Sequence, residues 1–138
     1  MKRLIQFINE DKNWDTAKLL NELVKNFFFS QGLVFNKSNI TFEFWLTPDE
    51  KRSGTVAVTD LLDHNNIRIR FDKNVDIWSD EFEVALLHEL IHVYLARKYP
   101  DKYGQNSINA NMPHDDKFKE ICKKVSDAYG EEIPLTVD

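Results

Sequence analysis

Three residues of this chain have the types and spacing of a hydrolytic metal site: His88, Glu89 and His92, which form an H-E-x-x-H motif. On a helix, residues four apart lie one turn above each other, so both imidazoles can bind the same metal ion. Glu89 lies beside the same face, where its carboxylate can act as a general base toward a water that the metal activates. Because neutral imidazole suits Zn²⁺, the motif predicts one catalytic zinc ion.

The residues around the motif predict a buried helix. From Phe82 to Leu95 the sequence is apolar almost all round, which is typical of a helix in the middle of a domain. Ala85 and Ala96, one turn before and after the histidine pair, leave room around that face. The alternative is that the two histidines are ordinary core residues that bind no metal. However, a chance H-E-x-x-H is expected in only about one such chain in a hundred, which favours the metal site.

A catalytic zinc ion usually has three protein ligands and one open position. Leu95 and Lys98 stand where a metzincin has a glycine and its third histidine, so that subtype is excluded. Two other histidines remain. We interpret His64 as a solvated residue of a turn between strands. We predict His114 as the third ligand, because the loop before it can fold back over the motif helix.

Carboxylates near His114 compete for the role of third ligand: Asp115, Asp116 and Glu120. Asp115 and Asp116 also have a simpler explanation, since acidic residues are favoured in the first turn of a helix. If one of them bound in addition to the three histidines, the closed set of four ligands would make the site structural.

The elements that position these residues follow from hydrophobic periodicity and turn residues. We predict a helix at about 15–30, strands at 40–46, 55–59 and 67–71, the motif helix at about 79–99, a polar loop at 101–113, a last helix at about 114–130 and an edge strand at 133–137. Asp15 or Asn13 is expected to cap the first helix, and Asp80 has capping-box spacing to Glu83 at the motif helix. The fold class is therefore α+β, with a small antiparallel or mixed three-stranded sheet packed against helices and the zinc site on a central helix.

Composition narrows the class of protein. The chain has 138 residues, of which 42% are hydrophobic, so we expect a single domain over 1–138 with its core at about 15–130. Its net charge of −5 argues against nonspecific coating of nucleic acid. One cysteine, Cys122, excludes an intramolecular disulfide and a C-terminal Cys-rich zinc ribbon. With no signal peptide and no apolar run of about 18 residues, a cytoplasmic protein without a membrane partner is expected.

The segments 86–92 and 114–118 together resemble the SprT-like (Spartan-type) metalloprotease domains, the second through a His-x-x-x-Phe match. The order of the predicted elements agrees with that family over roughly 15–130. The resemblance implies a minimal zincin-like fold, zinc bound by His88, His92 and His114, and Glu89 as the catalytic base. It also implies that proteins associated with or crosslinked to DNA are substrates. Asp115 departs from the family, which usually has glycine after the third histidine.

The sequence thus predicts a zinc metalloendopeptidase that acts on a protein or peptide substrate. The alternative is a non-proteolytic zinc-binding regulatory or interaction module built on the same fold. Tyr103 and the asparagines of 105–111 are candidates for stabilising an oxyanion. Peptide specificity and oligomeric state are not predicted.

Weak or local contact with DNA is a further expectation, which depends on basic residues that converge in space. Arg68 and Arg70 are predicted to point outward from a strand. The last helix has a basic face, which we interpret as solvated, formed by Lys117, Lys119, Lys123 and Lys124.

Overall fold

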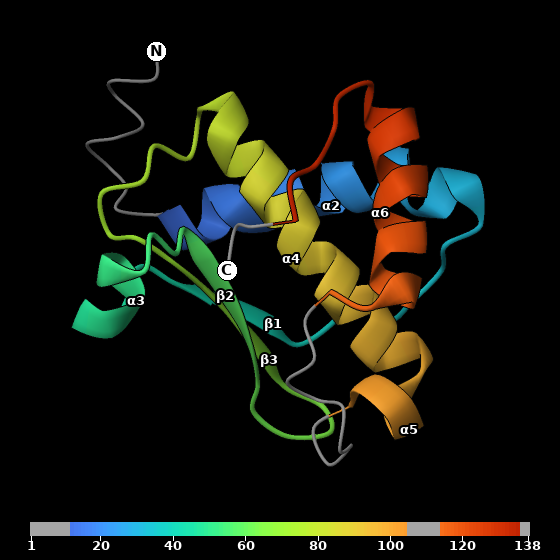
Figure 1. The fold of residues 1–138 in the computed structure, drawn as a ribbon, viewed down its shortest axis with the longest axis horizontal. Helices are drawn as coiled ribbons and strands as arrows, with labels where there is room; N and C mark the ends of the chain where they lie inside the picture. Colours follow the sequence, from blue (N-terminus) through green and yellow to red (C-terminus); the bar gives the residue numbers. More distant parts are fainter. Residues whose placement is uncertain (1–11, 105–113, 136–138) are drawn as a thin grey trace.

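A computed structural model describes residues 12–104 and 114–135 and has the predicted α+β architecture (Figure 1). Its helices are α2 (Lys12–Phe27), the 3₁₀ helix η1 (Phe29–Gln31), α3 (Pro48–Arg52), α4 (Asp80–Lys98), α5 (Pro100–Tyr103) and α6 (Asp116–Tyr129). Its strands are β1 (Ile40–Glu43), β2 (Ala57–Leu61) and β3 (Ile67–Phe71). The prediction of helices packed with a three-stranded sheet is confirmed.

The three strands form a mixed sheet in the order β1-β3-β2. β1 runs parallel to β3, with Ile40 opposite Ile67, and β2 runs antiparallel to β3, with Ala57 opposite Phe71. Successive side chains of a strand point to opposite faces. Ile67, Ile69 and Phe71 therefore share the face that enters the hydrophobic core, while the arginines between them lie on the other face.

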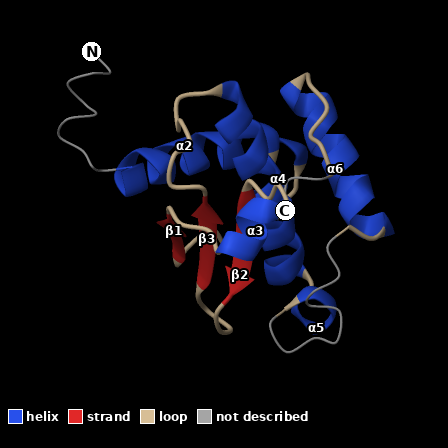
Figure 2. Ribbon diagram, turned by 60° about the vertical axis from the view of Figure 1, so that its left-hand side comes forward, coloured by secondary structure: helices blue, strands red, loops and turns tan. Residues whose placement is uncertain are grey.

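Helix α4 is the central element of the molecule, as its apolar sequence predicts. From Phe82 to Ala96, every residue except Glu83, Val84 and His92 is buried. β2 and α6 both contact α4, and Figure 2 shows the sheet and α6 on opposite sides of it. Among the described residues, no helix is both long and apolar enough to cross a membrane.

Two predicted helix caps are wrong. α2 already includes residue 12, so Asp15 and Asn13 lie inside the helix, and its N-terminal cap falls outside the described residues. α4 is capped by Ser79, whose hydroxyl accepts a hydrogen bond from the Phe82 N–H at 3.1 Å. Serine in the extended conformation can place its oxygen over the first turn, so Asp80 becomes a residue of that turn.

Three predicted strands differ from the structure, and one short helix was not predicted. β1 ends at Glu43, and α3 replaces the expected turn because Thr47 and Glu50 form a capping box. β2 begins two residues later than the predicted 55–59 strand. Residues 133–135 do not form the expected edge strand, and 136–137 lie outside the described residues.

Helix α5 occupies the start of the predicted loop at 101–113, of which 105–113 falls outside the described residues. Pro100 begins this helix directly after α4, where proline is favoured because its missing N–H is not needed. Gly104 ends it by donating its N–H to the Pro100 carbonyl at 2.9 Å. A side chain at Gly104 would collide with that carbonyl, so the turn requires glycine.

Candidate metal centre

His88, His92 and His114 come together, as the motif and the last helix predicted. One ring nitrogen of each lies within 4.8 Å of the other two, an arrangement that could hold a metal ion. The Nε2 atoms of His88 and His114 are 3.2 Å apart. Two imidazole nitrogens bound to one tetrahedral zinc ion would be separated by about 3.3 Å, so the observed spacing fits such an ion.

Two separate elements supply the three imidazoles. His88 and His92 lie one turn apart on α4, with ring centroids 5.1 Å apart. His114 precedes α6, and its place depends on Asp115, which caps that helix by accepting a hydrogen bond from the Phe118 N–H at 3.0 Å. The residue after the third histidine therefore sets the start of α6.

A tyrosine holds Asp115 from the other side. The Tyr103 hydroxyl donates to Asp115 Oδ2 at 2.6 Å, while Oδ1 is the capping atom. Burial opposes ionisation of Asp115, but the hydrogen bonds from Tyr103 and from the Phe118 N–H outweigh it and lower its pKa. Since each oxygen of Asp115 already has a donor, the structure does not favour Asp115 as a metal ligand. The Tyr103 hydroxyl, which is a predicted candidate for stabilising an oxyanion, therefore donates its hydrogen bond to Asp115.

The packing of Phe118 explains the His-x-x-x-Phe spacing. Its side chain is fully buried, and its ring centroid lies 5.1, 4.6 and 4.7 Å from those of His88, His92 and His114. One aromatic ring thus packs against all three imidazoles. Phe118 lies four residues after His114, which is about one helical turn. This spacing places the Phe118 ring against the His114 imidazole.

The orientation of His88 is fixed by a hydrogen bond on its far side. Nδ1 lies 2.8 Å from the carbonyl oxygen of Pro134, which can only accept, so Nδ1 carries the proton. The lone pair of Nε2 then faces the other two histidines. This is the tautomer that a metal bound through Nε2 requires, and a backbone carbonyl is a common partner of a metal-binding histidine.

Glu89 lies beside the three histidines and is fully buried. The Thr59 hydroxyl on β2 donates to Glu89 Oε1 at 2.7 Å. Oε2 lies 3.9 Å from His88 Nε2, the nitrogen that faces the cluster. This placement allows the carboxylate to take a proton from a molecule held at the centre of the cluster.

The other candidates lie away from this centre. His64 is exposed in the turn of 63–66, as predicted. Asp116 is exposed, and Glu120 forms ion pairs with Lys117 and Lys124 on the surface of α6. The asparagines of 105–111 lie outside the described residues.

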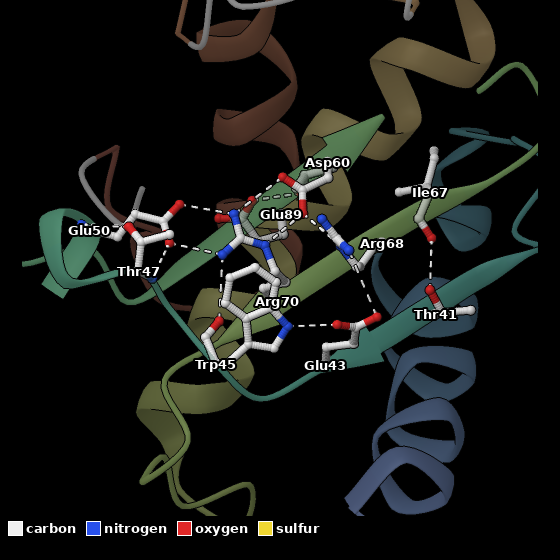
Figure 3. A network of polar contacts seen from close by, with 11 residues as sticks. Thr41, Glu43, Trp45, Thr47, Glu50, Asp60, Ile67, Arg68, Arg70 and Glu89 are labelled. Carbon is white, nitrogen blue, oxygen red and sulfur yellow. Dashed lines mark hydrogen bonds and ion pairs between the residues drawn. The ribbon is translucent and has the colours of Figure 1, made fainter. Parts of the chain in front are cut away.

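A second polar cluster covers the other face of the sheet, and we call it the sheet-face network. It consists of Glu43, Trp45, Glu50, Asp60, Arg68 and Arg70. Figure 3 shows the Arg70 guanidinium between the Trp45 ring, 4.3 Å from its centroid, and the carboxylates of Glu50 and Asp60. Hydrogen bonds from Arg70 lower the pKa of Glu50 to about 2.

Arg70 points outward from the strand, as predicted, but the prediction did not include its burial. Its side chain is on the outer face of the strand, but it is only 5% exposed because Trp45 and α3 cover it. Arg68 donates from Nε to Asp60 at 2.9 Å. Both guanidinium groups are therefore paired with carboxylates, and they do not form a phosphate-binding pair.

Sequence reasoning missed two groups that contact the site. Thr59 lies 30 residues before Glu89 on a strand, and Pro134 acts through a carbonyl group that every residue has. Neither position has a motif or a spacing that points to the histidines. Phe118, in contrast, stood in the recognised His-x-x-x-Phe spacing, although its packing role was not predicted.

Comparison of the chain with protein-family models, with curated proteins and with solved structures found no match.

Proposed function

We propose that the chain is a zinc-dependent endopeptidase with a minimal zincin-like domain of the SprT-like kind. The observation that supports this proposal is the buried Glu89 carboxylate beside three converging imidazole nitrogens. His88, His92 and His114 would hold the zinc ion, and three protein ligands leave one position open. When bound, zinc supplies Lewis acidity to the attacking water and to the scissile carbonyl.

In this mechanism Glu89 moves the proton. The Thr59 hydroxyl holds Oε1, so Oε2, which lies on the side of His88, accepts a proton from the water. The water oxygen bonds to the carbonyl carbon, the peptide C–N bond breaks, and Oε2 delivers the proton to the departing amine. Because α4 is buried on nearly every side, Glu89 needs little rearrangement to reach its reacting position.

The proposed substrate class is an unfolded protein or peptide, with proteins crosslinked to DNA as the narrower candidate. The sheet-face arginines do not support DNA binding, since both are paired with carboxylates. We assign weak or local DNA contact to the exposed lysines of α6, which are Lys119, Lys123 and Lys124. Lys123 and Lys124 also pair with carboxylates, but these pairs lie in solvent and are weaker than those of the buried Arg70.

The test compares the wild type with Glu89→Gln, His114→Ala and Glu81→Gln. Glu81 is exposed in the first turn of the same helix, so Glu81→Gln is a matched control for the loss of one carboxylate. Elemental analysis gives zinc per chain, and cleavage of an unfolded protein and of a DNA-crosslinked protein is followed with and without a chelator.

We expect one zinc ion per chain in the wild type, in Glu81→Gln and in Glu89→Gln, and its loss in His114→Ala. Glu89→Gln should reduce cleavage by about 10²- to 10⁴-fold, the usual contribution of a general base. Full turnover by zinc-loaded Glu89→Gln would disprove the mechanism. Zinc binding without any cleavage by the wild type would favour the regulatory or interaction module instead.

A further inference from the structure

Residues 130–135, which we call the return segment, connect the end of α6 to the metal centre. Gly130 ends α6 in the left-handed conformation, with φ at 89°, so the chain reverses there. Four residues later the Pro134 carbonyl accepts the hydrogen bond from His88 Nδ1. The segment is therefore close enough to α4 to control one of its imidazoles.

Several contacts anchor the return segment on α6. The Ile133 side chain is 1% exposed and belongs to the hydrophobic core. Its N–H donates to the Ser126 hydroxyl at 3.0 Å, and its carbonyl accepts from the Cys122 thiol at 3.3 Å. Both backbone polar groups of Ile133, its N–H and its carbonyl, are therefore hydrogen-bonded to α6. These bonds fix the backbone one residue before Pro134.

Proline at 134 restricts the segment further. Its ring fixes φ, and it keeps the preceding residue out of the helical region. Because Ile133 is anchored and the φ angle of Pro134 is fixed, the Pro134 carbonyl has few orientations available. Little entropy is therefore lost when this carbonyl accepts the hydrogen bond from His88.

We propose that the return segment is part of the metal centre, with the Pro134 carbonyl as the positioning group that holds His88 in its metal-binding tautomer. This inference rests on the proposed function because it assumes that the histidines bind zinc. α6 would then control the site from both ends, through Asp115 before its first turn and through the return segment after its last.

The experiment weakens that one carbonyl and leaves every side chain in place. Cys122 is the chain's one cysteine, so recombinant residues 1–121 can be ligated to a synthetic 122–138 peptide. In the test chain an ester replaces the amide between Pro134 and Leu135, because an ester carbonyl is a weaker acceptor. One control chain has all amides. A second has the ester between Glu131 and Glu132, whose linking carbonyl and N–H bond to no other described residue.

Two readouts are measured on the refolded chains, whose fold is checked by circular dichroism. Long-range ¹H–¹⁵N spectra of metal-free protein report which nitrogen of His88 carries the proton, and competition with a zinc chelator reports affinity. We expect Nδ1–H in both controls, a shift toward Nε2–H in the test chain, and zinc affinity lower there by about 10-fold.

An unchanged tautomer and unchanged zinc affinity in the test chain would overturn the inference. If no chain binds zinc, the proposed function fails, and the tautomer alone then decides the role of Pro134. Should the ester chain not refold, a recombinant chain that ends at residue 133 replaces it, because that chain lacks the Pro134 carbonyl that accepts from His88. Loss of the single His88 tautomer in that variant supports the inference, and an unchanged tautomer and affinity overturn it.

Discussion

Strand β2 separates two polar clusters that are buried in different ways. Thr59 and Asp60 are neighbours in sequence, but their side chains point to opposite faces of the sheet. Asp60 belongs to the sheet-face network, where it accepts hydrogen bonds from Arg68 and Arg70. Thr59 points toward α4 and donates to Glu89 beside the histidines.

The two clusters differ in what satisfies their charges. In the sheet-face network, guanidinium and carboxylate groups of the chain itself neutralise each other, as with Arg70 and its partners Glu50 and Asp60. In the metal centre, three imidazole nitrogens converge on one point next to a carboxylate, which is a set of donors suited to a cation. The comparison indicates that the first cluster stabilises the fold, whereas the second is a group of side chains that could hold a metal ion.

The largest expected effect tests the network. Arg70→Met leaves Glu50 and Asp60 without their buried cation, and removing one partner of a buried ion pair costs about 3–5 kcal/mol. Urea denaturation should show that loss in the free energy of unfolding, with zinc content unchanged in the folded fraction. Arg68→Met is the matched control: its side chain is 26% exposed, so about 1 kcal/mol or less is expected. Equal effects of the two substitutions would contradict the distinction.

For His92→Gln we expect the reverse of the Arg70→Met result, with a large loss of zinc affinity and a small loss of stability. Removing a direct ligand should weaken zinc binding by more than about 100-fold, which is the upper end of the effect of losing an outer hydrogen bond. The metal-free protein should lose only about 1 kcal/mol, because His92 is half-buried and the glutamine side chain can still pack on the Phe118 ring. Competition with a chelator and urea denaturation of the metal-free chain measure the two quantities. Undiminished zinc affinity would exclude His92 as a ligand.

Acid should weaken the network through Glu50. Its pKa is lowered from 4.5 to about 2 in the folded protein, so below pH 4.5 the unfolded state binds the proton more readily. The stabilisation is complete above that pH and is lost as the pH falls toward 2, by about 3 kcal/mol in all. Denaturation curves of the wild type and Glu50→Gln across this window test the prediction. The variant should be less stable at neutral pH and should lack this part of the pH dependence.

The smallest effect concerns the hydrogen bond from Thr59. Thr59→Val keeps the shape of the side chain and removes the donor to Glu89, which should cost about 2 kcal/mol because a buried acceptor loses its hydrogen bond. Thr59→Ser keeps the hydroxyl and serves as the control. Unfolding free energies and cleavage rates of both variants are compared with the wild type. Equal behaviour of valine and serine would show that the hydroxyl does not position Glu89.

Much of the fold could be predicted from local pattern. The apolar run around His88 predicted the buried α4, and alternation predicted β3 together with its core face. The ends of elements were less well predicted, as at Ser79 and at α3, because capping depends on which nearby oxygen reaches a free N–H. The burial of Arg70 was not predicted because it depends on Trp45 and Glu50, which come from a different part of the chain.

The sequence by itself determined the pair of imidazoles on one helical face with Glu89 beside them, since helical geometry relates residues four apart wherever the helix lies. It also indicated His114, because that histidine follows a loop able to fold back over the motif helix and belongs to the His-x-x-x-Phe segment of the resemblance. Only the tertiary structure decided that Thr59 holds Glu89, that Tyr103 and Asp115 set the place of His114, and that Pro134 orients His88. These contacts join residues 12 to 46 positions apart. Hydrogen bonds over such separations depend on how helices and strands pack, and no local pattern encodes them.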